Sequence, residues 1–148
     1  MFLLFFCMVN VSAIKEIGYY ENISNDNFDV DSIAFSPYNS NMLIPSPNTN
    51  ATLYNITDLS KIRELADPTS GVTAIDWSMD GVYVALGSND DNVYIYNTSD
   101  WSLETTLTYA SHNIFDVSFS PNGNYIAYST SYSHLDDDGG YIYIHNTN

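Results

Sequence analysis

Apolar and polar residues alternate in short runs along most of the chain, which is typical of β-strands that bury one face. Turn residues separate the runs, and Asp80-Gly81 and Asn122-Gly123 are pairs that supply the positive φ of tight hairpins. The apolar residues do not follow the 3.6-residue period of an amphipathic helix over any long segment. The pattern therefore predicts an all-β protein assembled from hairpins.

The strand pattern repeats with a period of 42 residues. Each copy opens with a similar strand, at residues 30–36, 72–78 and 114–120. An aromatic residue, directly followed by serine, occupies the same place in each copy: Phe35, Trp77 and Phe119. Because several positions match at one spacing, the chain contains three copies of one unit, over residues 28–69, 70–111 and 112–148.

Each unit contains further short strands separated by turns. The second strands are expected at 42–44, 83–86 and 125–128, and the third strands at 51–55, 93–97 and 142–146. Fourth strands are expected at 62–65 and 103–107. Ile14–Ile17 is their counterpart ahead of the first unit. Such a unit predicts a four-stranded antiparallel meander. Residues two apart in a strand share a face, and this spacing predicts a buried face made by Ile33, Phe35, Ile75, Trp77, Val117 and Phe119.

The opening strands and turns resemble those of WD repeats. The segments VTAIDWSMDG at 72–81 and FDVSFSPNG at 115–123 carry the resemblance, and DSIAFSP at 31–37 is a weaker match. The resemblance covers residues 14–148 and implies blades of a β-propeller, about three in number, in an incomplete ring. It also implies a protein-interaction scaffold that is not an enzyme.

The sequence departs from the WD pattern at the residues that form a hydrogen-bond network in typical blades. The Trp-Asp pair appears as Tyr54-Asn55, Tyr96-Asn97 and His145-Asn146, and the Gly-His pair appears only as Ser111-His112. The resemblance implies a structural place for His112. Propellers of the quinoprotein-like and Tol-B-like kinds stay open as alternatives.

The charge balance argues against anionic partners. The chain has eighteen acidic and three basic residues, for a formal net charge of −15. Such a surface repels nucleic acid and anionic membranes, so neither is expected as a partner. The acidity favours basic proteins or divalent cations as binding partners, but it does not identify a particular one.

Acidic residues gather in the turns between second and third strands. Candidate partner-binding residues in these turns are Ser88, Asn89, Asp90, Asp91, His134, Asp136, Asp137 and Asp138. Clustered carboxylates could hold Ca²⁺, but their spacing matches no calcium loop, and we expect solvated hairpins with no metal and no cofactor. The resemblance implies that protein partners dock on these turns and on the connections between units at 66–71 and 108–113.

The first residues suggest a secretory leader. Met1 to Val9 form an apolar run, and Val11-Ser12-Ala13 resembles a signal-peptidase site, so residues 1–13 are expected to be a signal peptide. The alternative is a strand of a preceding blade. A signal peptide predicts a secreted protein whose mature chain does not insert into a membrane. Such a protein could be a secreted structural or cell-surface glycoprotein. A strand at residues 1–13 would instead allow a cytoplasmic protein.

Three blades are fewer than the four to eight that usually close a propeller. The pattern therefore predicts a homo-oligomer or a fragment of a larger propeller.

Overall fold

A computed structural model describes residues 31–39, 41–45, 49–131 and 139–147. The expected leader at 1–13, the expected strand Ile14–Ile17 and the acidic turn with His134, Asp136, Asp137 and Asp138 lie outside the described residues. No helix occurs in the described residues, and none there could cross a membrane.

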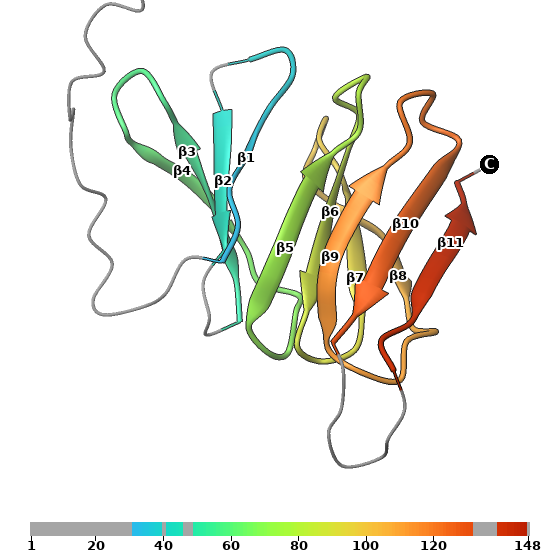
Figure 1. Cartoon of the computed structure of the whole chain (residues 1–148). Coiled ribbons are helices and arrows are strands. Elements are labelled where there is room, and N and C mark those ends of the chain that lie inside the picture. The colour runs from blue at the N-terminus through green and yellow to red at the C-terminus, as the bar shows by residue number, and fades with distance from the viewer. Residues whose placement is uncertain (1–30, 40, 46–48, 132–138, 148) are drawn as a thin grey trace, which may run out of the picture.

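The strands form three antiparallel sheets that stand side by side (Figure 1). Blade 1 contains β1 (Ala34–Phe35), β2 (Asn41–Pro45), β3 (Ala51–Asn55) and β4 (Lys61–Leu65). Blade 2 contains β5 (Val72–Trp77), β6 (Tyr83–Ser88), β7 (Val93–Asn97) and β8 (Leu103–Leu107). Blade 3 contains β9 (Ile114–Phe119), β10 (Tyr125–Thr130) and β11 (Ile142–Asn146). Within each blade, consecutive strands are neighbours, which confirms the predicted meander and the all-β propeller architecture.

Local turn chemistry explains why the hairpins close at the same places in successive copies. Gly81 and Gly123 have φ values of 68° and 72° in the turns that follow β5 and β9, a conformation that glycine adopts without steric cost. In each turn a serine at the end of the first strand binds the second strand: Tyr83 N donates to Ser78 Oγ at 2.8 Å, and Tyr125 N donates to Ser120 Oγ at 3.0 Å. The serine that recurs in the sequence therefore closes these hairpins.

The hydrophobic core lies between blades. One cluster joins blades 1 and 2 and includes Leu53, Trp77 and Leu86. A second cluster joins blades 2 and 3 and includes Ile95, Phe119 and Ile126. Blade 2 thus buries both of its faces, which is why β6 and β7 are buried almost throughout instead of alternating.

The predicted buried face is correct for two copies and wrong for the first. Ile75, Trp77, Val117 and Phe119 are buried, whereas Ile33 and Phe35 are exposed. Ala34, between these two residues, packs toward the core shared with blade 2, so Ile33 and Phe35 point to the opposite face of blade 1. No blade among the described residues covers that face.

The difference between equivalent positions yields a stability prediction. Trp77 is 7% exposed and packs edge-on against Trp101 with ring centroids 5.7 Å apart, while Phe35 is 60% exposed. We expect Trp77→Ala to lower the free energy of unfolding by roughly 3–5 kcal/mol. Phe35→Ala should lower it by less than about 1 kcal/mol in dilute solution. Urea unfolding followed by circular dichroism measures both, and equal effects of the two substitutions would contradict the inter-blade core.

Candidate functional site

The loops between blades and the turns after the second strands meet at one end of the blades, the lower end in Figure 1. The backbone N–H of Asn89, after β6, donates to the carbonyl of Gly71, before β5, at 2.9 Å. The N–H of Ser131 donates to the carbonyl of Asn113 at the same distance, one repeat further on. We call this surface, formed by residues 66–71, 88–92, 108–113 and 130–131, the loop end.

Asp90 organises the loop end of blade 2. Its Oδ2 accepts hydrogen bonds from the backbone N–H of Thr69 at 2.6 Å, from Thr69 Oγ1 at 2.9 Å and from the Tyr94 hydroxyl at 2.9 Å. Partial burial opposes ionisation, but these hydrogen bonds outweigh it and hold the pKa of Asp90 below its ordinary value of 3.8. The carboxylate therefore ties the turn after β6 to the connection between blades 1 and 2.

A second tyrosine–aspartate pair lies beside it. Tyr96, at the position of the WD tryptophan, donates its hydroxyl to Asp67 Oδ2 at 2.8 Å. Burial, together with this bond to a carboxylate, raises the pKa of Tyr96 far above its usual range. In blade 3 the two equivalent residues are His145 and Tyr109, whose rings stack with centroids 6.1 Å apart. The third strand is thus joined to the preceding connection in both blades, by different chemistry.

The predicted partner-binding residues divide into two groups. Asn89 is exposed, and Asp90 and Asp91 are partly exposed. Ser88 has no exposed surface, and its hydroxyl donates to the carbonyl of Ser70 at 3.2 Å. The Ser88 hydroxyl also accepts from the Asp90 N–H at 3.3 Å, so this side chain holds the turn together from inside and has no exposed surface for a partner to contact.

His112 lies at the loop end of blade 3. Its Nδ1 is 3.0 Å from Ser111 Oγ, and its ring stacks on Tyr141 with centroids 6.2 Å apart. These contacts join the connection after β8 to the residue just before β11.

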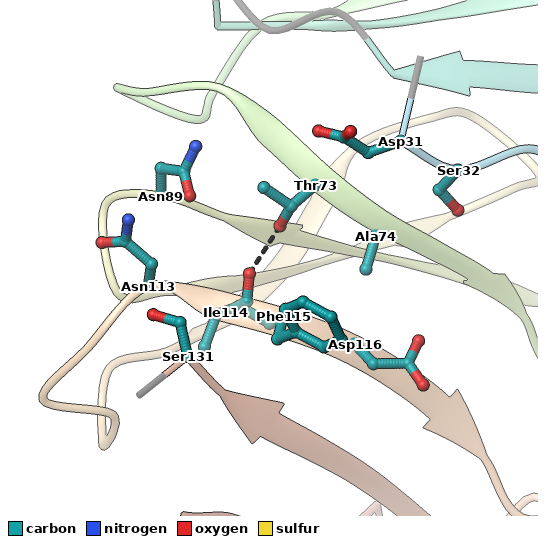
Figure 2. Close-up of a pocket in the computed structure, with 10 residues that line it drawn as sticks. All are labelled: Asp31, Ser32, Thr73, Ala74, Asn89, Asn113, Ile114, Phe115, Asp116 and Ser131. Carbon is teal, nitrogen blue, oxygen red and sulfur yellow. Dashed lines mark hydrogen bonds between the residues drawn. The ribbon is translucent and has the colours of Figure 1, made fainter. Parts of the chain in front are cut away.

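A pocket of about 450 Å³ opens beside the loop end (Figure 2). Its walls come from the residues just before β1, from the first residues of β5 and β9, and from the adjoining turns: Asp31, Ser32, Thr73, Ala74, Asn89, Asn113, Ile114, Phe115, Asp116 and Ser131. Thr73 Oγ1 donates to the carbonyl of Ile114 at 2.6 Å across the junction of blades 2 and 3. The pocket therefore exists only when neighbouring blades are in register.

The loop end and its pocket carry negative charge. Their acidic residues are Asp31, Asp67, Asp90, Asp91 and Asp116. The basic residues in the described ranges, Lys61 and Arg63, lie on β4, the outer strand of blade 1, where Lys61 forms an ion pair with Glu64. In the part of the chain that the structure describes, no three histidine, cysteine or acidic side chains converge as a metal site.

Comparison with known proteins agrees with this architecture. The family described as "WD domain, G-beta repeat" matches residues 59–97 and 102–143, which is more than half of the chain. The chain therefore belongs to the WD40-repeat family and forms β-propeller blades.

Among solved structures, the crystal structure of the RRP9 WD40 repeats is similar, with a TM-score of 0.66 and 14% sequence identity. The match covers 72% of this chain and 34% of that one, so the chain spans about a third of the length of that structure. A search of curated proteins found no match.

Sequence reasoning did not find the two tyrosine–aspartate pairs or the pocket. A comparison of the repeats could have pointed to the Tyr96–Asp67 pair. Asp67 and Tyr109 are 42 residues apart, and their partners, Tyr96 and His145, both occupy the position of the WD tryptophan. The pocket depends on how three blades pack, which no local pattern specifies.

The hydrogen bonds of Asp90 predict a pH dependence of stability. Because the pKa of Asp90 is lowered by folding, its contribution is present above 3.8 and is lost as the pH falls through the lower pKa of the folded chain. We expect Asp90→Asn to cost about 1 kcal/mol near neutral pH, and this difference from wild type should shrink in acid. Urea unfolding over a pH series measures it.

Asp91→Asn is the matched control, since it removes the same charge from the same turn. Its effect near neutral pH should be smaller than that of Asp90→Asn. A cost of Asp90→Asn that is the same at every pH would contradict the assigned ionised acceptor.

Proposed function

We propose that the chain is a non-enzymatic protein-interaction scaffold whose loop end binds a basic segment of a partner protein. One observation carries the proposal: the loop end and its pocket contain five aspartates and none of the described lysine or arginine residues. Membership of the WD40-repeat family supports the general class, because propeller blades hold their loops on a rigid scaffold.

The chemistry of the pocket indicates which partner groups would fit. Asp31 and Asp116 offer carboxylates to lysine or arginine, and Asn89 and Asn113 offer amides on another side of the pocket (Figure 2). The exposed ring of Phe115 adds an apolar contact. A partner segment that alternates basic and apolar residues would match this lining, whereas a nucleic-acid backbone would be repelled by it.

An enzyme or a cofactor-binding propeller of the quinoprotein kind is less well supported. Such a site would need a central polar pocket with convergent acids or arginine residues. The pocket has Asp31 and Asp116 on its walls but no arginine. Arg63 is exposed on β4 and does not line the pocket.

We predict that a synthetic peptide with alternating lysine and leucine residues binds the chain, and that binding weakens as ionic strength rises. Asp31→Asn combined with Asp91→Asn should weaken it about fivefold, since each exposed charge contributes up to about 1 kcal/mol. Fluorescence anisotropy of the labelled peptide measures the affinity, and a glutamate–leucine peptide tests for non-specific apolar binding.

Asp58→Asn combined with Asp100→Asn is the control variant. These aspartates occupy equivalent turns after β3 and β7, at the other end of the blades, and the double variant has the same net charge. Equal loss of affinity in the two double variants would show that net charge, and not the loop end, attracts the peptide.

We also propose that the chain is secreted, because residues 1–13 combine an apolar run with a small-residue cleavage pattern. In that compartment the acceptors Asn10, Asn22, Asn50, Asn55 and Asn97 become candidates for glycosylation, but Asn10 is removed with the leader. Intact-mass measurement after expression in eukaryotic cells reports cleavage and glycosylation together. An unprocessed, unmodified chain retained in the cytoplasm would contradict secretion.

A further inference from the structure

Nothing in the described structure covers the two outermost blade faces, whereas the equivalent faces inside the molecule are covered by the neighbouring blade. Ile95 on β7 is 6% exposed because blade 3 packs on it, whereas Ile144, its equivalent on β11, is 72% exposed. Val93 and Ile142 show the same contrast at the start of these strands. The exposed face of blade 3 therefore has the residue types that hold a following blade elsewhere in the chain.

The exposed face of blade 1 is the other half of the same interface. Trp77 and Phe119 are the residues by which blades 2 and 3 pack on the blade before them. Phe35 occupies their position in blade 1 and is exposed, as is the nearby Ile33. The parts of the internal interface that come from the first and third strands are thus present once more as two separate halves. The internal interfaces also contain Leu65 of β4 and Leu107 of β8, and the described part of blade 3 has no such fourth strand.

The polar contacts of the internal interfaces also have a counterpart on the exposed face of blade 3. The Ile75 N–H of blade 2 donates to Ser32 Oγ of blade 1 at 3.3 Å, and the Phe119 N–H of blade 3 donates to Asp76 Oδ2 of blade 2 at 2.7 Å. Asp116 has the repeat position of Ser32 and is exposed. Its Oδ1 accepts from the Val117 N–H at 3.0 Å, as Asp76 Oδ1 accepts from Trp77 N–H at 2.9 Å. In blade 3, Asp116 thus has a carboxylate at the position from which Ser32 of blade 1 accepts the N–H of the next blade.

We propose that blade 3 of one chain packs on blade 1 of a second copy, and that two such contacts close a six-bladed ring. Ile142 and Ile144 of each copy would cover the inner strand of the other, and Asp116 would accept the N–H of Ile33. Six blades lie within the range that closes a propeller. A second copy fits because each exposed face is half of an interface that this chain already forms with itself. Asp116 also lines the pocket beside the loop end, but residues 66–71, 88–92, 108–113 and 130–131 take no part in these contacts.

The charge of the chain gives the association a distinctive salt dependence. Each copy carries a formal charge of −15, so two copies repel each other at low ionic strength, and salt screens this repulsion. The dimer should therefore strengthen as salt is added. This trend is opposite in sign to that expected for basic peptides at the loop end, so the two proposals can fail independently.

Sedimentation equilibrium of the full chain over a range of protein and salt concentrations tests the proposal. We expect a monomer–dimer equilibrium that shifts toward dimer with salt. Ile144→Asp and Phe35→Asp should each weaken the dimer at least about thirtyfold, because each would bury an unpaired carboxylate. Met79→Asp is the control, since Met79 is as exposed as Phe35 but belongs to the turn after β5 of blade 2, whose two faces are already covered.

Mixing the two variants distinguishes head-to-tail packing from other arrangements. The Ile144→Asp chain keeps an intact blade 1 face and the Phe35→Asp chain keeps an intact blade 3 face, so the mixture should form a one-interface heterodimer that neither variant forms alone. Dimerisation of Phe35→Asp alone at wild-type strength would overturn the proposal, because blade 3 would then pair with itself. A wild-type chain that is monomeric at every concentration and salt level would overturn it too, and would leave further blades of a longer protein as the cover of these faces.

Discussion

The packing of each blade on the one before it is the contact on which the rest of the structure depends. Every large buried cluster in the described residues spans two blades, and blade 2, covered on both sides, supplies residues to each. The approach is close: a Cβ added to Gly87 on β6 would lie 2.5 Å from Ile114 Cγ2 of blade 3. A side chain at position 87 would push the blades apart, so glycine at this position allows β9 to pack closely against β6.

The candidate site follows from the same contact. Thr73 and Ile114 are hydrogen-bonded across the junction that forms the pocket, and Asp76 accepts the Phe119 N–H further along the same strands. Burial raises the pKa of Asp76 above its ordinary value even though it accepts two backbone N–H groups. Burial of the Asp76 carboxylate is thus electrostatically unfavourable, but its hydrogen bond from the Phe119 N–H fixes the register of blades 2 and 3.

Most of the fold could be predicted from the sequence, because a 42-residue period with hairpin turns specifies both the strands and which positions are equivalent. The period does not say whether an equivalent position has a neighbouring blade. Phe35 and Trp77 therefore look alike in sequence and differ in burial. Of the candidate site residues that the structure describes, Asn89, Asp90 and Asp91 lie in the turn after β6 with exposed or partly exposed side chains, whereas Ser88 is buried. The bond between Tyr96 and Asp67 joins segments that are distant in the sequence, so a comparison of whole repeats could point to it but a local pattern could not.

Amide hydrogen exchange of β6 and β10 tests most directly whether inter-blade packing, and not hydrogen bonding within a blade, holds the structure together. Both are central strands paired on each side, but β6 is buried on two faces and β10 on one. In dilute, low-salt solution we expect markedly slower exchange in β6 than in β10. Equal protection of the two strands would mean that the hydrogen bonds within a blade suffice, and would contradict the dependence of the structure on inter-blade packing.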